Sequence, residues 1–340
     1  LKNPDARVVL ARLSEGERLS RVVDAAEGLS TGDNARFVRG FWEVGLRCPS
    51  WVRYAGADVT NQLYGGRELL VRWDDGSGPL ATSPQARIQG VSMWERTGVL
   101  VGRIRGISAS AYTGGAFDKS CLAVCPKGSN VPVAALLCYL SSHEYRVDVR
   151  RLDQKLGAAA SALLSVAYAE GHWQKVAEEM GPLPEPYSED PTQWLFKGHP
   201  ARATEPLQVA VARLLGYRWP EQEDDGLDAL TDKDGIVCLP SLQREPPAED
   251  RLRALLAAAY EGQDTAPPGV PGGKTLGEWL RDDFFSEHCR LFHQRPFIWH
   301  IWDGRKDGFS VLVNYHKLDR QLLGRLAHTY LGEWIDRQKQ

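Results

Sequence analysis

Short runs of apolar, aromatic and β-branched residues, broken by glycine and aspartate pairs, fill the first half of the chain. Runs of this length with such breaks between them are typical of β-strands joined by turns. Strand-like segments are expected within 51–73, 98–104, 108–112 and 121–124. Helical spacing of apolar residues predicts one helix at 5–28, ending at Gly28, and another at 131–142, with Pro132 in its first turn.

The apolar spacing becomes helical near residue 155. Helices are expected at 156–177, where Gly171 is a point of interruption, and at 204–216, 248–260, 275–293 and 318–337. Two apolar runs, 297–302 and 309–315, flank a turn with two glycines and predict a β-hairpin. The acidic segment 221–234 is expected to be a solvated loop. The fold class expected is α+β, with a β-rich module followed by a mainly helical domain that contains the hairpin.

The composition is that of a globular protein. The chain has 340 residues, 43% hydrophobic and 25% charged, which favours two domains or one large one and excludes wholesale disorder. No run approaches 18 uncharged apolar residues, and the N-terminus has no signal-peptide core. The six cysteines form no disulfide framework, so free thiols and a cytoplasmic location without membrane contact are expected.

Charge is unevenly distributed along the chain. The whole chain has a net charge of −3, but residues 1–165 hold 21 Lys and Arg against 16 Asp and Glu, and the remainder is acidic. A basic half indicates an anionic partner for that half. Chance variation in surface charge is the alternative explanation.

Motifs for catalysis or metal binding are absent from the sequence. It has no glycine-rich phosphate loop and no Gly-x-Ser-x-Gly elbow. Cys121 and Cys125 lack a second Cys/His pair at zinc spacing. Asp303, Lys306 and Asp307 share one tight turn, where turn formation explains them better than Mg²⁺ binding does. No catalytic residue and no metal ligand is therefore predicted.

Cationic side chains alternate with hydroxyl groups and glycines over residues 96–119. Arginine and lysine bind phosphates or guanine edges, and serine and threonine hydroxyls donate to phosphates. This composition suits a nucleic-acid surface. The tryptophans of the acidic half stand at helix and strand positions and are expected to pack in the core.

Several strings resemble a known family. Residues 28–39 (GLSTGDNARFVR), followed by FWEV at 41–44, resemble the segment after the catalytic domain in large adenine-specific DNA methyltransferases. These enzymes include the type IIG restriction-modification (Eco57I-like) and the BREX phage-defence (PglX-like) proteins. Strings at 64–66, 73–76 and 102–111 resemble their target-recognition region. Strings at 172–177, 183–187, 190–196, 214–220, 234–238, 295–300 and 306–317 resemble their C-terminal region.

The resemblance implies a domain order. Residues 1–28 would be a connecting helix from an upstream catalytic domain, 29–155 the target-recognition domain, and 156–340 the mainly helical C-terminal domain with hairpin 297–315. The family's Asn-Pro-Pro-Tyr motif and methyl-donor loop do not occur here, and the chain does not start with Met. The expectation is the C-terminal part of such an enzyme. S-adenosylmethionine would belong to the parent enzyme, with no cofactor in this chain.

The favoured function is therefore DNA sequence recognition for an adenine-N6 methyltransferase that flips its target base. The expected partners are double-stranded DNA, the upstream methyltransferase domain and other phage-defence proteins. An interaction scaffold without DNA affinity is the second hypothesis, and a self-contained hydrolase or nuclease the third. The residues expected to bind DNA are Asn34, Arg36, Arg39, Arg103, Arg105, Ser108, Ser110, Tyr112, Thr113 and Lys119.

Overall fold

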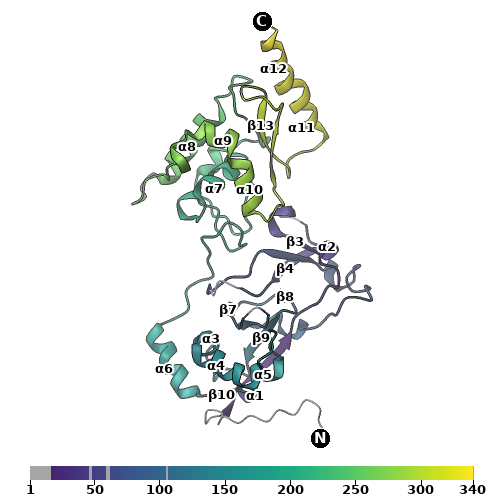
Figure 1. Cartoon of the computed structure of the whole chain (residues 1–340), viewed down its shortest axis with the longest axis vertical. Helices are drawn as coiled ribbons and strands as arrows, with labels where there is room; N and C mark the ends of the chain where they lie inside the picture. Colours follow the sequence, from purple (N-terminus) through teal and green to yellow (C-terminus); the bar gives the residue numbers. More distant parts are fainter. Residues whose placement is uncertain (1–16, 46–47, 59–61, 105, 340) are drawn as a thin grey trace. The chain divides into compact units, whose positions relative to one another are not determined.

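The computed structural model describes residues 17–45, 48–58, 62–104 and 106–339. The chain forms two compact units. Unit 1 comprises Leu1–Phe41 and Arg47–Tyr187, and unit 2 comprises Trp42–Leu46 and Ser188–Gln340. Apart from the short segment Trp42–Leu46, the boundary between the units along the chain lies between residues 187 and 188, and the boundary expected from the sequence lies between 155 and 156. Each unit combines helices with a largely antiparallel sheet, which confirms the α+β class (Figure 1).

The larger sheet of unit 1 is antiparallel throughout, in the order β2-β9-β6-β7. Its strands are β2 (Val23–Glu27), β9 (Cys121–Pro126), β6 (Gly98–Gly102) and β7 (Ala109–Tyr112). Every residue of β6 and β7 is buried, and helix α3 (Val133–Ser141) packs on both strands. Strands buried on both faces are uniformly apolar or small, which explains the runs seen in the sequence.

A second sheet of unit 1 has the order β3-β5-β4-β8, with only the β4–β8 pair parallel. Its strands are β3 (Val38–Gly40), β5 (Leu69–Arg72), β4 (Trp51–Ala55) and β8 (Ala116–Phe117). An apolar cluster that includes Phe37, Tyr54 and Val71 fills one side of it. These strands confirm the expected β-rich character of this region.

Two helices expected in unit 1 are replaced by other structure. Within the described part of the predicted helix 5–28, only α1 (Leu19–Val22) is helical; β1 (Glu17–Arg18) and β2 are strands, so a continuous helix is wrong here. Pairing of β2 with the apolar strand β9 outweighs the local helical spacing. The predicted helix 156–177 is divided into α5 (Ala160–Leu164), β10 (Ala167–Tyr168) and α6 (Glu170–Met180), and Gly171 lies inside α6. The remaining helices are α2 (Asn34–Phe37) and α4 (His143–Leu152).

Unit 2 is built around a three-stranded antiparallel sheet in the order β11-β13-β12. Strands β12 (Ile298–Trp302) and β13 (Ser310–Asn314) form the predicted hairpin, and β11 (Ile236–Cys238) pairs with β13. The helices are α7 (Pro206–Leu214), α8 (Ala248–Tyr260), α9 (Leu276–Asp282), α10 (Phe284–Leu291), α11 (Arg320–Arg325) and α12 (Leu331–Gln338). The single helix expected at 275–293 is divided at Asp283, whose φ of −119° lies outside the helical range. No helix in the described part of the chain is long and apolar enough to cross a bilayer.

The segment Trp42–Leu46 belongs to unit 2 although its neighbours in sequence belong to unit 1. The Trp42 side chain is 1% exposed, and its indole donates to the carbonyl oxygen of Arg295 at 3.1 Å. The Arg295 guanidinium pairs with Glu43 at 2.9 Å. His316 lies 2.6 Å from the carbonyl oxygen of Trp42. Trp42 and Glu43 of the FWEV string are therefore integrated into unit 2.

The acidic segment 221–234 is not simply solvated, because two of its carboxylates hold a buried arginine. Arg213 is fully buried and donates to both carboxylate oxygens of Asp225, at 2.8 and 2.7 Å, and to Asp228 at 3.0 Å. Burial alone would raise the pKa of Asp225. The hydrogen bonds and charge of Arg213 overcome that effect and lower the pKa below its usual 3.8.

We predict that Asp225→Asn lowers the free energy of unfolding by about 2 kcal/mol at pH 7. This is less than the roughly 3–5 kcal/mol typical of a broken buried ion pair, because Asp228 still reaches Arg213. Urea unfolding followed by tryptophan fluorescence measures the loss. Because the pKa is lowered on folding, the loss is complete above pH 3.8 and shrinks as the pH falls below it.

The matched control is Asp224→Asn, in the same loop. Asp224 is exposed and accepts a 3.4 Å hydrogen bond from the amide of Gly226. The free energy of unfolding of this control should lie within about 0.5 kcal/mol of the wild-type value. Equal free energies of unfolding for Asp225→Asn and Asp224→Asn at pH 7 would contradict the stabilising role of Asp225.

Candidate nucleic-acid interface

A cleft of about 540 Å³ opens on unit 1. Five segments of unit 1 form its walls: β2 with the loop after it, the β5–β6 connection, the β6–β7 connection, the β8–β9 loop and the segment after α4. Four cations, two carboxylates and two side-chain amides lie along these walls. The lining residues are Glu27, Ser30, Gln85, Arg87, Gln89, Arg103, Ile104, Lys119, Asp153, Lys155, Gly157, Ala158 and Ala159.

A close approach between two backbones fixes the first wall. A Cβ atom on Gly28 would lie 2.3 Å from the carbonyl oxygens of Phe117 and Asp118, so only glycine fits there. The amide of Leu29 donates to the Phe117 carbonyl at 2.8 Å, and the amide of Lys119 donates to the Leu29 carbonyl at 3.0 Å. These bonds fix the backbone that carries the Lys119 side chain.

The next residues of this loop continue the wall. Ser30 and Arg87 exchange two backbone hydrogen bonds, of 3.0 and 2.7 Å, so Arg87 is held at the edge of the cleft. Gly32 adopts a φ of +72°. The Asp33 carboxylate caps α2 by accepting from the amide of Arg36 at 3.1 Å. The backbone of the GLSTGDN string is thus hydrogen-bonded to neighbouring segments and positions cleft residues.

Arg103 joins the β6–β7 connection to the segment after α4. Its guanidinium pairs with Glu27 at 2.6 Å and donates through Nε to the carbonyl oxygen of Ala158 at 3.1 Å. The amide of Ala158 donates back to the Arg103 carbonyl at 3.0 Å. The carboxylate of Asp153 accepts from the amides of Lys155 and Ala159, both at 3.0 Å. The charge of Arg103 is therefore compensated, and its side chain serves to hold the 157–159 segment in place.

The other three cations of the cleft are not compensated in this way. The side chains of Arg87, Lys119 and Lys155 are exposed, and none forms an ion pair with another described residue. Glu27 is engaged by Arg103, and both oxygens of Asp153 accept backbone amides. The cleft therefore presents uncompensated positive charge, which attracts anions such as phosphates.

Two of the predicted DNA-binding residues, Arg103 and Lys119, lie together in this cleft. Asn34, Arg36 and Thr113 are exposed but do not line it. Arg39 is half-buried, and its guanidinium donates to the carbonyl oxygen of Ala35 at 2.6 Å and to that of Val38 at 2.7 Å.

The remaining predicted residues lie on or beside β7. Ser108 is half-buried, and Ser110 and Tyr112 are each 2% exposed. The Tyr112 hydroxyl donates to the carbonyl oxygens of Met93, at 3.2 Å, and Gly115, at 2.6 Å. Burial and these bonds make Tyr112 part of the core. Arg105 lies outside the described residues.

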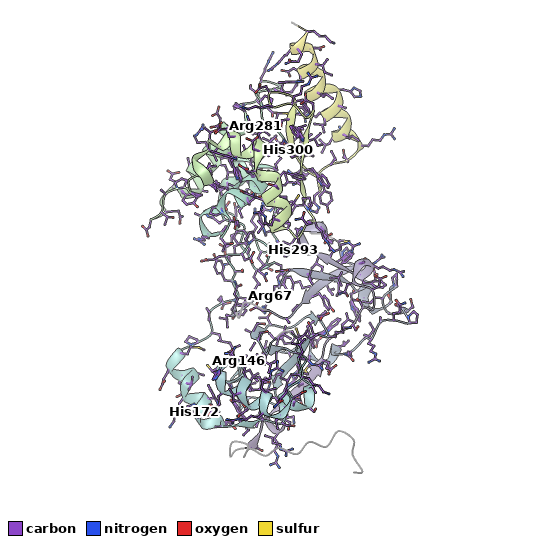
Figure 2. The ribbon with its side chains drawn as sticks, viewed as in Figure 1. Arg67, Arg146, His172, Arg281, His293 and His300 are labelled. Carbon is purple, nitrogen blue, oxygen red and sulfur yellow. The ribbon has the colours of Figure 1, made fainter. Side chains whose placement is uncertain are left out.

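Sequence reasoning missed Arg87, Lys155, Gln85 and Gln89, which line the same cleft. They come from irregular segments without apolar periodicity, so no local pattern marks them. Only the basic balance of residues 1–165 indicates that such cations gather somewhere. Another arginine, Arg67, is labelled in Figure 2 but is buried, donates to the carbonyl oxygen of Gly65 at 2.9 Å and has its pKa lowered to about 10 by burial.

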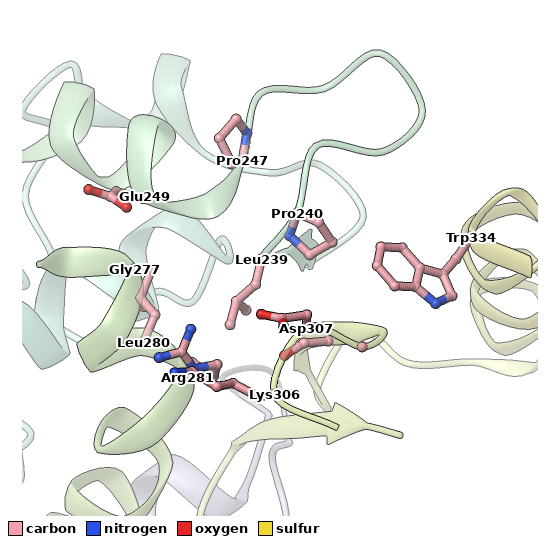
Figure 3. Close-up of a pocket in the computed structure, with 12 residues that line it drawn as sticks. Leu239, Pro240, Pro247, Glu249, Gly277, Leu280, Arg281, Lys306, Asp307 and Trp334 are labelled. Carbon is pink, nitrogen blue, oxygen red and sulfur yellow. The ribbon is translucent and has the colours of Figure 1, made fainter. Parts of the chain in front are cut away.

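A second cleft, of about 230 Å³, lies in unit 2 (Figure 3). Arg281, Lys306 and Trp334 are among its lining residues. Arg281 is already paired with Asp282 at 2.8 Å, and Glu249 is paired with Arg253 at 2.5 Å. The charges here are of both signs and largely compensated, so this cleft favours no ligand class. No group of three or more potential metal ligands occurs among the described residues.

Comparison with known proteins gives one informative similarity. No protein-family model matches the chain. A stretch of 64 residues is 37% identical to the adenine-specific methyltransferase PglX of Lacticaseibacillus casei (strain Zhang). Part of this chain resembles a methyltransferase. The matched stretch is 18% of this chain and 5% of PglX, so the chain corresponds to a small part of that protein.

We predict that Gly28→Ala lowers the free energy of unfolding by about 1–3 kcal/mol, since its methyl group must displace the backbone at Phe117 and Asp118. Thermal unfolding followed by circular dichroism measures the change. Gly171→Ala is the control, because its added Cβ meets nothing within 4 Å and alanine favours the helix α6. Equal stability of Gly28→Ala and wild type would contradict the close approach.

Proposed function

We propose that unit 1 binds duplex DNA as the target-recognition part of an adenine-N6 DNA methyltransferase. The observation that carries the proposal is the group of uncompensated cations, Arg87, Lys119 and Lys155, around one cleft. The similarity to PglX supports the methyltransferase context. In this proposal a catalytic domain outside this chain binds S-adenosylmethionine and receives the flipped adenine.

The cleft residues suit the two tasks of DNA recognition. Lysine and arginine side chains neutralise phosphates and release counterions, which sets position and affinity. The exposed Gln85 can form paired hydrogen bonds with the N6 and N7 edge of adenine in the major groove. Gln89 is less free, because its side-chain amide donates to the Gly28 carbonyl at 2.8 Å.

The predicted DNA-binding residues that do not line the cleft would have other roles. Asn34, Arg36 and Thr113 are exposed and remain candidates for backbone contacts. The buried Ser110 and Tyr112 would act by supporting the sheet that carries the β6–β7 connection. The proposal keeps the upstream methyltransferase domain and other phage-defence proteins as partners.

The test is fluorescence anisotropy of the full chain with a labelled duplex at several salt concentrations. We expect a steep fall in affinity with salt, and a slope that decreases by roughly 0.9 for each phosphate contact removed. The triple variant Arg87→Ala, Lys119→Ala, Lys155→Ala should therefore reduce the slope by up to about 2.7.

Lys175→Ala is the matched control, since Lys175 is an exposed lysine of unit 1 on α6, outside the cleft lining. It should change neither the affinity nor the slope by more than a small amount. A triple variant that binds like wild type would contradict the placement of the interface. Absence of binding at every salt concentration would contradict DNA binding by this chain.

A second candidate function, a protein-interaction scaffold, is favoured by the edge strand β12. This strand pairs with β13 on one side, and no other described strand pairs with it. Trp299, Ile301 and Trp302 are 49, 39 and 53% exposed on it. An open edge with exposed apolar side chains accepts an extended segment of another protein by strand addition.

Ile301→Lys tests this candidate, because a charged side chain on an edge strand opposes pairing. Binding of purified phage-defence proteins to the immobilised chain should weaken about tenfold or more in this variant. Leu230→Lys, at a 38% exposed position elsewhere in unit 2, should bind like wild type. Equal loss in both variants, or none in either, would exclude β12 as the binding site.

A further inference from the structure

Large aliphatic side chains are exposed at the cleft, and two of them lie on adjoining segments. Ile104, which lines the cleft, is 48% exposed, and Leu156 is 76% exposed. Leu156 is bracketed by the lining residues Lys155 and Gly157. A third, Ile88, is 39% exposed between the lining residues Arg87 and Gln89. Single exposed aliphatic residues are common on protein surfaces, but two on adjoining segments of one cationic cleft need an explanation.

The backbone places these two residues on adjoining segments. Arg103 and Ala158 are joined by hydrogen bonds in both directions, 3.1 Å from the guanidinium and 3.0 Å from the amide of Ala158. An added Cβ on Gly157 would lie 3.9 Å from the Arg103 carbonyl oxygen, so the two segments also touch there. Ile104 follows the first segment directly, and Leu156 precedes the second.

Both segments are anchored, so the side chains are presented from a fixed frame. The amide of Arg103 donates to the carbonyl oxygen of Ser120 at 2.8 Å, next to strand β9. Asp153, which is 9% exposed, accepts from the amides on either side of Leu156, at Lys155 and Ala159. A side chain held in this way loses little further conformational freedom when it enters a ligand.

We propose that Ile104 and Leu156 form a wedge that enters a base step of the DNA duplex held by the cleft cations. This inference rests on the proposed DNA-binding function and adds the residues that deform the duplex. Apolar side chains inserted between base pairs unstack them and kink the duplex, while neighbouring cations hold the phosphates. Loosening the stack in this way lowers the cost of extruding an adenine toward a catalytic domain.

Charge complementarity favours nucleic acid over a hydrophobic protein surface as the occupant of this cleft. Arg87, Lys119 and Lys155 form no ion pair with another described residue, and Gln85 adds an exposed amide. A hydrophobic protein partner would have to bury these cations without compensation, which is costly. A DNA duplex supplies phosphates for the cations and an apolar base stack for the two aliphatic side chains.

The experiment uses the full chain and a duplex with 2-aminopurine at successive positions. The fluorescence of this base rises when it is unstacked. We expect wild type to raise the signal at one position of the bound duplex. The variant Ile104→Ser, Leu156→Ser should lose this rise and bind about tenfold more weakly. Its salt slope should equal that of wild type, because no phosphate contact has been removed.

Two further variants control for size and for general loss of apolar surface. Ile104→Leu, Leu156→Ile should retain the fluorescence rise, because both positions remain aliphatic. Val91→Ser replaces another exposed aliphatic residue of unit 1, 45% exposed and outside the cleft lining, and should behave like wild type. Circular dichroism of each variant verifies that the fold is intact.

The outcomes separate this inference from the function on which it rests. Salt-dependent binding with an unchanged 2-aminopurine signal in the serine variant would overturn the wedge and leave DNA binding standing. A change in salt slope in the serine variant would also overturn it, since the two residues would then act on phosphate contacts. Absence of DNA binding by wild type would overturn both proposals.

Discussion

The contact of the backbone at Gly28 with the backbone at Phe117 and Asp118 is the constraint on which the cleft depends. A side chain at position 28 would occupy the space of two carbonyl oxygens. This contact aligns Leu29 with Phe117 and Lys119, and the chain then continues to the Ser30–Arg87 pair. Backbone hydrogen bonds thus place cations from two distant parts of the sequence on one surface.

The cationic side chains discussed above fall into two groups: those that pair with a carboxylate and those that do not. Arg213 and Arg103 are engaged by acidic partners, and each holds a loop against its unit. Arg87 and Lys119 have no such partner among the described residues and are exposed. Engaged arginines stabilise the fold, whereas free cations remain available to an anionic ligand. The distinction cannot be made from residue type, because it depends on which carboxylates the fold brings near.

The pattern of apolar and turn residues predicted those helices and strands whose formation depends mainly on nearby residues. The buried strand β6, the helices α7 and α8, and the β12–β13 hairpin match their predicted segments, because apolar runs and turn residues dominate there. Pattern failed where distant pairing decides, as at β2, whose helical spacing is overruled by β9. It indicated only part of the cleft lining, because Arg103 and Lys119 are among the predicted residues but Arg87 and Lys155 are not. Backbone hydrogen bonds between distant segments bring the cleft residues together, and residue types do not show which backbone groups will pair.

The position of Trp42 has a consequence for dividing this protein into fragments. The chain leaves unit 1 after Phe41, contributes Trp42–Leu46 to unit 2 and returns at Arg47. A fragment cut at residue 188 would lack the indole that packs against Phe292 with ring centroids 5.2 Å apart. The fragment before the cut would carry the same tryptophan without its pocket. A single cut therefore yields two incomplete pieces, and co-expression or a circularly permuted chain would be needed to recover unit 2 whole.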